Sequence, residues 1–416
     1  MTSQPACILT LNGGSSSIRF AVYELGDTLR RRVDGQIDRL GTRSATFIVR
    51  DPVGAPQARR LLDTADRGVA VAAVLDWLGA HPLFASMTAV GHRVVHGMRY
   101  VQPELITPAL LAQLRRNTSY APDHLPSEIS LIDAVAQRLP GLPQVACFDT
   151  AFHRTMPRLA TLLPIPRRFE AEGIQRYGFH GLSYAYLMSE LTRLGDPAAS
   201  TGRVILAHLG SGASLAAVRD GQSIDTTMGF TPTGGVPMGT RCGDLDPGVI
   251  NYLIQARGLT PARVHHMLNH ESGLLGVSDS SADMRDLLAQ EGGDVRAAEA
   301  VGLFCYQVRK GIGALAAALG GVDTLVFAGG IGEHAPQVRA RVCAELSFLG
   351  IELDASLNAE SAEVISSSAS RATVRVIRTD EELMIARSVL RSVLRREDGD
   401  VTDAVQSGTA ARTGWA

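Results

Sequence analysis

A strand, a loop of small residues and a second strand occur twice in this 416-residue chain. The first copy is ILTLNGGSSSIRFAVYELG, from Ile8 to Gly26, and the second is VILAHLGSGASLAAVRDG, from Val204 to Gly221. Glycine permits positive φ and a close approach to the backbone, and consecutive N–H groups in such a turn form an anion-binding nest. The repeat therefore predicts either a duplicated domain with two hairpins facing a shared cleft, or two unrelated strand-turn-strand units of an α/β protein.

The rest of the chain alternates short apolar runs with amphipathic stretches of helical length, which predicts an α/β fold with mostly buried sheets. The predicted strands are Ile8–Leu11, Ile18–Tyr23, Ala45–Val49, Gln144–Phe148, Val204–His208, Leu215–Val218, Thr324–Phe327 and Val374–Ile377. The predicted helices are Gly68–Leu78, Ser127–Arg138, Ala297–Leu319, Pro336–Leu346 and Glu381–Arg396. Residues 397–416 are polar and small without an apolar period, so we predict a disordered tail there.

Composition excludes several classes of protein. The formal net charge is −2, which gives no basic field for nucleic acid. The five cysteines form no C-x-x-C pair, so we expect reduced thiols in a cytoplasmic protein rather than disulfides or a zinc site. The most apolar window, 313–332, is interrupted by Asp323 and several glycines. We therefore expect neither export nor a membrane span.

A third glycine-rich element, TLVFAGGIGEHAPQVR, runs from Thr324 to Arg339. It predicts a buried strand, a Gly-Gly-x-Gly turn and a helix with Pro336 in its first turn. No Gly-Lys-Ser/Thr follows, so it is not a Walker A loop, and it lacks the full G-x-G-x-x-G of dinucleotide-binding folds. Packing alone also explains such turns, but a nucleotide site outside those two families is the more specific interpretation.

Eight motifs occur in order between about Ile8 and Arg387. They are LNGGSSSIRF, GHRVVHG, FDTAFHRTMP, RYGFHGLS, HLGSGAS, MGFTPTGGVPMGTRCGDLDPG, FAGGIGEH and TDEELMIAR. With these motifs the chain resembles the acetate kinase (acetokinase) family, which belongs to the superfamily of sugar kinases, actin and Hsp70. The resemblance implies two duplicated actin-like, ribonuclease H-like α/β domains with an interdomain active-site cleft. The first would span 1–149 and be completed by the helix 381–396, and the second, nucleotide-binding domain would span 150–380.

The resemblance also implies a reaction. ATP would phosphorylate acetate reversibly to acetyl phosphate by direct in-line transfer, with Mg²⁺ as the metal and Mn²⁺ as an alternative, in a cytoplasmic homodimer. A propionate, butyrate or other short-chain acyl kinase fits the same mechanism. Two further hypotheses stay open, namely a non-kinase ATP-binding actin-like protein and an inactive family member.

Joining a carboxylate to a phosphate brings two anions together, so the site needs fixed cations and a metal. By the resemblance, Arg93 would hold the carboxylate, while Arg241 and His180 would stabilise the transferring phosphoryl group. Isolated arginines are often solvated surface residues, and His180 could equally be a buried structural histidine. Arg93 differs in context, because apolar residues and two histidines flank it.

The resemblance makes Asp149 the catalytic acid or base. A substrate carboxylate is already ionised at neutral pH, so placing Mg²⁺ or its waters is the more natural role, and capping the following turn is the structural alternative. Asn12 and Glu381 would complete the metal site. Glu381 could instead be a first-turn acid that favours the helix dipole, and Glu382 beside it leaves the choice of carboxylate open.

The resemblance assigns ATP contacts to three separate segments and to the first hairpin. These residues are Arg19, His208, Leu209, Gly210, Ser211, Gly212, Asp283, Met284, Arg285, Gly329, Gly330, Ile331, Gly332 and Glu333. Arg19 replaces the lysine that is usual in the family, and Ser211 replaces an asparagine.

For the acyl chain, the resemblance implies an apolar patch of Val95, Phe179 and Pro232. Asp123 stands where the family normally has an apolar residue, and Leu125 replaces an asparagine. An acid in this pocket would repel a carboxylate unless a nearby cation neutralised it. Acetate is therefore a weaker expectation than the carboxylate kinase chemistry itself.

Overall fold

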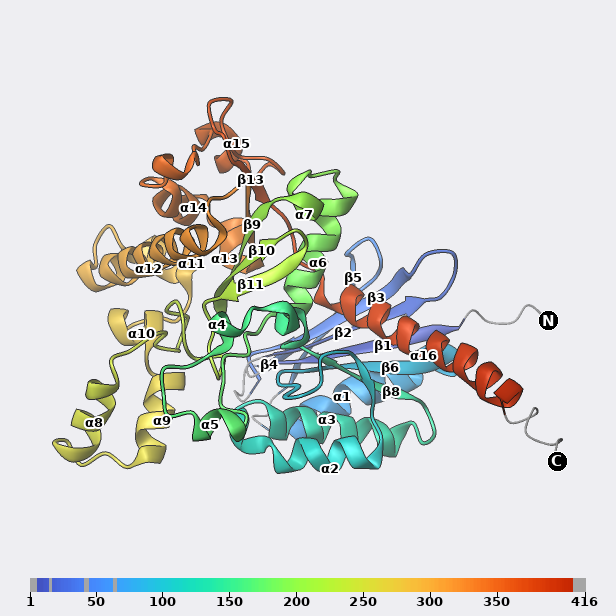
Figure 1. Cartoon of the computed structure of the whole chain (residues 1–416). Coiled ribbons are helices and arrows are strands. Elements are labelled where there is room, and N and C mark those ends of the chain that lie inside the picture. Colours follow the sequence, from blue (N-terminus) through green and yellow to red (C-terminus); the bar gives the residue numbers. More distant parts are fainter. Residues whose placement is uncertain (1–5, 15–16, 41–44, 63–65, 407–416) are drawn as a thin grey trace, which may run out of the picture. The chain divides into compact units, whose positions relative to one another are not determined.

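The computed structural model describes residues 6–14, 17–40, 45–62 and 66–406 (Figure 1). The chain divides into two compact units. Unit 1 comprises Met1–Ala151 and Glu381–Ala416, and unit 2 comprises Phe152–Asp380. No helix in the described ranges has the length and apolarity to cross a bilayer.

The sheet of unit 1 is built around the first glycine- and serine-rich hairpin. Strands β1 (Cys7–Gly13) and β2 (Ser17–Glu24) are antiparallel, and β3 (Arg30–Asp38) pairs antiparallel with β2. On the other side of β1, strands β6 (Met87–Val94) and β8 (Gln144–Phe148) add in parallel. Strands β4 (Ala45–Arg50) and β5 (Pro56–Leu62) extend one edge, and β7 (Glu104–Leu105) extends the other. All seven residues of β1 are buried, as expected of a central strand.

Helices cover both faces of this sheet. Val90 on β6 packs in one apolar core with α1 (Arg67–Ala80) and α3 (Leu125–Arg138). The next residue, Gly91, faces the opposite way, because a Cβ atom there would lie 2.4 Å from Ile385 of α16 (Glu381–Gln406). Glycine at this position lets the C-terminal helix lie close against the sheet. Helix α2 (Pro108–Arg116) contacts α3.

Unit 2 contains a five-stranded sheet with the order β11-β10-β9-β12-β13. Its strands are β9 (Arg203–Leu209), β10 (Ala213–Arg219), β11 (Gln222–Thr226), β12 (Thr324–Ala328) and β13 (Thr373–Val376). The first three are mutually antiparallel, and β12 and β13 add in parallel. Helices α6 (Gly181–Arg193) and α7 (Ala198–Thr201) pack on the face that carries Leu206, whereas α12 (Val295–Leu319) covers the face that carries Leu215.

The remaining helices of unit 2 lie in the connections between these elements. They are α4 (Arg158–Thr161), α5 (Arg168–Ala171), α8 (Pro247–Gln255), α9 (Pro261–His270), α10 (Gly273–Ser278), α11 (Met284–Gln290), α13 (Gly329–His334), α14 (Pro336–Cys343) and α15 (Ala355–Ala359).

The two sheets share one topology. The central strands of unit 1, β3-β2-β1-β6-β8, have the same order and directions as β11-β10-β9-β12-β13. In each, the glycine-rich hairpin supplies the first two strands, and two parallel strands follow. The predicted α/β class and the duplication are confirmed, and the interpretation of unrelated hairpins is wrong.

Two predictions about local structure need correction. The segment Gly329–Gly332 is not a turn ahead of a helix, since α13 already begins at Gly329, and α14 follows from Pro336. Helix α16 does not end at Arg396 but continues to Gln406. Extending an existing helix requires far less free energy than nucleating one, so ten residues without an apolar period can remain helical. The predicted tail is thus wrong for 397–406, and 407–416 lie outside the described residues.

Candidate functional site

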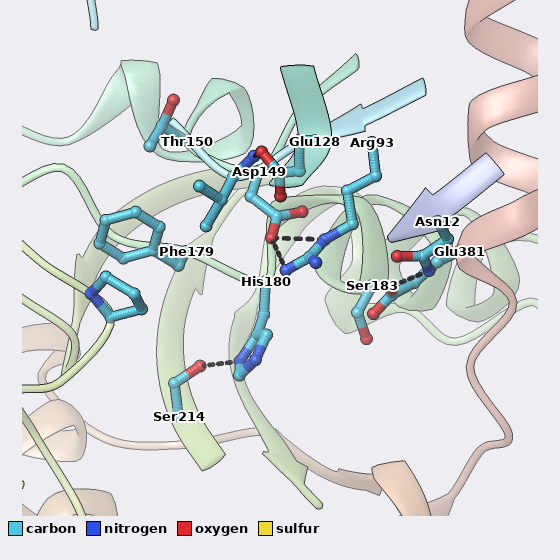
Figure 2. A network of polar contacts seen from close by, with 12 residues as sticks. Asn12, Arg93, Glu128, Asp149, Thr150, Phe179, His180, Ser183, Ser214 and Glu381 are labelled. Carbon is cyan, nitrogen blue, oxygen red and sulfur yellow. Dashed lines mark hydrogen bonds and ion pairs between the residues drawn. The ribbon is translucent and has the colours of Figure 1, made fainter. Parts of the chain in front are cut away.

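Arg93 and Asp149 form an ion pair at the ends of two neighbouring parallel strands of unit 1. Arg93 is the penultimate residue of β6, and Asp149 directly follows β8. The Nε and Nη2 atoms of Arg93 donate to Asp149 Oδ2 at 2.9 and 2.5 Å (Figure 2). The side chains are 12% and 1% exposed, so solvent and salt screen the pair little. Arg93 is therefore not a solvated surface arginine.

The charge of Arg93 is held firmly. Burial alone would lower its pKa, but the carboxylates of Asp149, Glu381 and Glu128 more than offset this effect, so the pKa lies above its ordinary value. Its third guanidinium nitrogen, Nη1, makes no hydrogen bond to the described residues. An arginine with one edge fixed by a buried carboxylate retains donors for an external anion.

Two residues that the sequence did not single out fix the loop after β6. Glu128, buried near the start of α3, accepts a hydrogen bond from the Val95 amide at 3.0 Å. The hydroxyl of Thr150 accepts one from the Gly97 amide at 3.1 Å. A Cβ atom at Gly97 would lie 2.8 Å from the Phe148 ring, so only glycine fits there. The only sequence signal for Glu128 was an acid in the first turn of an apolar helix.

Asn12 contacts both candidate metal-binding carboxylates. Its Nδ2 atom donates to Glu381 Oε2 at 2.8 Å and to Glu382 Oε1 at 3.1 Å, and the first contact is visible in Figure 2. Within the described ranges, no cluster of three or more His, Cys, Asp or Glu side chains has the arrangement of a metal site. One amide and two carboxylates nevertheless fit Mg²⁺, which prefers oxygen ligands and retains several waters. Both glutamates remain candidates.

The other predicted residues of unit 1 lie apart in the chain but within the same unit. Arg19 is exposed on β2, directly opposite Asn12 in the β1–β2 register. Val95 is 1% exposed, and Asp123 is half-buried in the turn ahead of α3.

In unit 2, His180 has a strained backbone held by a side-chain contact. Its φ of 58° and ψ of 24° lie in the left-handed region, immediately before α6. For a residue other than glycine this conformation costs roughly 1–2 kcal/mol. The Nδ1 atom of His180 lies 2.8 Å from Ser214 Oγ (Figure 2), and Ser214 also bonds to the Tyr184 hydroxyl. Such strain persists where surrounding contacts over-determine it, which is typical of functional sites.

Residues from three predicted motifs meet at the turn of the second hairpin. A Cβ atom at Gly212 would lie 3.0 Å from Arg241 Nη2 and 3.3 Å from His180 Nε2. Arg241 Nη1 donates to the Pro232 carbonyl at 2.6 Å. Because Gly212 has no side chain, both polar groups reach the backbone of the turn. A guanidinium and an imidazole beside a glycine turn would suit an anion there, and anion binding by the hairpin stays a prediction.

His208 lies beside this group. Its ring stacks on that of His180, with centroids 4.4 Å apart and an interplanar angle of 28°. His208 Nδ1 lies 2.8 Å from Ser183 Oγ, which in turn lies 2.8 Å from Thr379 Oγ1. The sequence did not single out Ser183 or Thr379, although both lie inside quoted motifs.

The Gly329–Glu333 segment reaches the same turn. A Cβ atom at Gly210 would lie 3.9 Å from the Gly330 amide nitrogen. Gly329 has φ of 76°, and a Cβ atom there would lie 2.7 Å from the Leu209 carbonyl oxygen. Both the backbone conformation and the lack of space therefore exclude a larger residue. Glu333 Oε1 accepts from the amides of Gly329 and Thr379 at 2.9 and 3.2 Å. Glu333 therefore has a structural role in shaping the loop.

Arg339 is a further residue that sequence patterns missed. It is completely buried and has no carboxylate partner in the described part of the chain, and its guanidinium donates to the carbonyls of Gly332 and Glu333 at 2.8 and 3.0 Å. It also bonds to Asn358 Oδ1 at 2.8 Å and to the Asn358 carbonyl at 2.7 Å. Burial lowers the pKa of Arg339 below its ordinary value. The residue caps the C-terminal end of α13 and thereby fixes the glycine segment.

The Asp283–Arg285 segment divides into different environments. Asp283 caps α11 and pairs with Arg285, whose side chain is 89% exposed, whereas Met284 is 3% exposed and packs in the core. The preceding residue, Ala282, lies near the hairpin, because Gly239 donates to the Ser211 carbonyl and closely approaches the Ala282 carbonyl.

The apolar candidates of unit 2 are buried. Phe179 is 1% exposed, and its carbonyl lies 3.0 Å from His153 Nε2. Burial lowers the pKa of His153 to about 4, so the ring is neutral. A carbonyl only accepts, so Nε2 carries the proton and Nδ1 accepts from the Ser223 hydroxyl, 2.8 Å away. Pro232 is also buried.

Comparison with known proteins shows the family of this chain. The family model described as the acetokinase family matches residues 7–387. The acetate kinase of Rhodopseudomonas palustris is 45% identical over 390 residues, which cover 92% of this chain and 98% of that protein. The crystal structure of Porphyromonas gingivalis acetate kinase matches with a TM-score of 0.82 and 36% identity, covering 93% of this chain and 99% of that one. A propionate kinase from Francisella tularensis matches with a TM-score of 0.85, 35% identity and the same coverage. The chain belongs to the acetokinase family.

Proposed function

We propose that this protein is an acetate kinase, which transfers the γ-phosphoryl group of ATP reversibly to acetate. A carboxylate oxygen attacks the γ-phosphorus, the bond to the β,γ-bridging oxygen breaks, and ADP leaves with that electron pair. The observation that best supports the proposal is the meeting of His180, Arg241 and Gly212, which presents a guanidinium and an imidazole edge to a glycine turn. Positive and hydrogen-bonding groups are needed there, because the transition state spreads negative charge over the phosphoryl oxygens.

We assign the carboxylate substrate to Arg93. Its charge is fixed by Asp149, and its Nη1 atom makes no hydrogen bond to the described residues. Because Asp149 is paired with Arg93, it holds the guanidinium in place rather than acting as a base, since acetate needs no deprotonation. Val95, Phe179 and Pro232 would contact the methyl group of acetate. Asp123 would limit the length of acyl chain that binds or change the preference among carboxylates.

We assign the nucleotide to residues of unit 2 and the metal to residues of unit 1. We propose that unit 2 binds ATP through the backbone of His208–Gly212 and Gly329–Gly332, with Asp283 and Arg285 near the adenosine. Asn12 and Glu381 would hold Mg²⁺, or Mn²⁺ in its place, which neutralises charge on the phosphate oxygens when bound. The short contacts of Asn12 to Glu381 and Glu382 support this choice of ligands.

The same site also suits a propionate kinase. The solved propionate kinase matches this chain as well as the acetate kinase structure does, at 35% against 36% identity. The 45% identity to a named acetate kinase favours acetate. We further propose a cytoplasmic location, which five free cysteines support, and a homodimer, which sedimentation equilibrium would test.

The experiment that tests the function is hydroxylamine trapping of acyl phosphate, with ATP and Mg²⁺ and with acetate, propionate, butyrate or no acid. We expect acetate-dependent product that Arg93→Ala abolishes. Arg115→Ala is the matched control, because Arg115 forms an exposed ion pair with Asp133 in the same unit. Asp123→Leu should shift the preference among the acids. ATP turnover that ignores every carboxylate would contradict the proposal.

A further inference from the structure

The histidine at the glycine turn is connected to a buried chain of hydroxyl groups. Ser214 Oγ lies within hydrogen-bond distance of both His180 Nδ1, at 2.8 Å, and the Tyr184 hydroxyl. Ser214 and Tyr184 are both 0% exposed. The three groups come from the residue before α6, from its first turn and from β10. The positions of the protons in these two contacts follow from donor and acceptor chemistry.

The direction of these hydrogen bonds sets the proton on the imidazole. A phenol is a better donor and a poorer acceptor than an aliphatic hydroxyl, so Tyr184 donates to Ser214 Oγ. The single proton of Ser214 is then directed to His180 Nδ1. A neutral imidazole has one N–H and one acceptor nitrogen. If Nδ1 accepts, the proton of neutral His180 resides on Nε2.

Nε2 is the atom of His180 that faces the turn. A Cβ atom at Gly212 would lie 3.3 Å from it, and 3.0 Å from Arg241 Nη2. An Nε2–H group can donate to a phosphoryl oxygen placed at this turn. The other tautomer would present a lone pair to the same oxygen and repel it.

We infer that Ser214 and Tyr184 are positioning residues, which hold neutral His180 in its Nε2–H tautomer with that group directed at the Gly212 turn. The benefit for phosphoryl transfer rests on the proposed function, whereas the tautomer itself does not. Neither residue touches the reacting atoms. They act only through the orientation and protonation of His180.

The same unit contains a built-in control. His153 also contacts a serine through Nδ1, at 2.8 Å from Ser223 Oγ, but its Nε2 proton is fixed by the Phe179 carbonyl at 3.0 Å. A carbonyl has no proton to give, so His153 keeps its tautomer when the serine is removed. His180 should lose its preference, because the serine hydroxyl is the group that bonds to its Nδ1 atom.

The test is long-range ¹H–¹⁵N correlation NMR of the full chain with ¹⁵N-labelled histidine, with assignments from His180→Gln and His153→Gln. We expect a protonated Nε2 and an unprotonated Nδ1 for His180 in the wild type. Ser214→Ala should give a mixture of tautomers, and Tyr184→Phe a smaller shift in the same direction. Ser223→Ala should leave the His180 signals unchanged and His153 in its Nε2–H form.

Activity supplies a second measurement. Ser214→Ala should lower kcat by about ten-fold, as expected when about one hydrogen bond's worth of transition-state stabilisation is lost, with a smaller change in KM for ATP. A wild-type His180 with the proton on Nδ1 overturns the inference, even if the enzyme makes acyl phosphate. If Ser214→Ala does not fold, the wild-type spectrum and Tyr184→Phe still decide. An Nε2–H pattern without carboxylate-dependent turnover would instead contradict the proposed function alone.

Discussion

Replacing Asp149 by asparagine tests the buried ion pair of unit 1. Asparagine keeps the size of the side chain and an oxygen acceptor for Arg93, but it removes the negative charge. Arg93 is 12% exposed, so its charge would lose its partner where water reaches it poorly. Loss of one partner of a buried ion pair costs about 3–5 kcal/mol. Glu128 and Glu381 remain and also favour the charged arginine, so we expect a loss near the lower limit, about 3 kcal/mol.

The assay is a double-mutant cycle in urea. Trp77 packs against the apolar core of unit 1, so its fluorescence follows the unfolding of this unit. Asp149→Asn and Arg93→Met should each destabilise the unit. The double variant removes both charges of the pair, so its loss should fall short of the sum of the two by about 2 kcal/mol. Asp133→Asn, which breaks an exposed pair with Arg115, should have a much smaller effect.

Two results would refute this reasoning. Asp149→Asn could unfold at the same urea concentration as the wild type, or the double variant could lose the full sum of the single losses. Either result would mean that Asp149 does not hold the charge of Arg93, and the assignment of the carboxylate substrate to Arg93 would lose its physical support.

Three further predictions concern unit 2. The pKa of His153 is about 4 in the folded protein against an ordinary value of 6.5, so below pH 6.5 the unfolded chain binds a proton that the folded chain does not, and stability decreases as the pH is lowered. Between pH 7 and pH 5 in urea titrations, the free energy of unfolding of His153→Gln should decrease by about 2 kcal/mol less than that of the wild type. Equal decreases would contradict this prediction. Gly212→Ala should displace Arg241 by a few tenths of an ångström and lower kcat in the hydroxylamine assay with an unchanged melting temperature. An unchanged kcat would contradict a role for the position of Arg241. Arg339→Met should raise KM for ATP more than KM for acetate, because it releases the end of α13; equal changes in both would indicate general unfolding.

The sequence predicted the local units of the fold well. The two hairpins were recognisable because continuous apolar runs flank glycine and serine, and both form as antiparallel pairs. The order of the strands could not be predicted from the residues, because β1 pairs with β6, from which a long stretch of sequence separates it. Strand β6 itself, MTAVGHRV, was missed because a glycine, a histidine and an arginine interrupt its apolar run. Its neighbours in the sheet, rather than its composition, make it a strand.

The site divides in the same way. Arg93 and Asp149 were each predicted, but their contact joins residues 56 positions apart and depends on the parallel pairing of β6 with β8. Arg339 gave no signal, because an arginine in a polar helix normally faces water, and only the carbonyls at the end of α13 justify its burial. Ser214 and Ser183 were also invisible, because a serine inside a glycine-rich motif first suggests a turn.

At the beginning of α6 the number of residues is constrained by contacts to three other segments. His180, Ser183 and Tyr184 lie within five consecutive positions, and they bond to Ser214, His208 and Thr379 from three other segments. Each residue of an α-helix advances by about 100°. Adding or deleting one residue here would turn Ser183 away from His208 and Tyr184 away from Ser214 at the same time. Exposed side chains along the rest of α6 can vary, whereas its buried residues pack in the core and the number of residues between the histidine and the tyrosine must stay the same.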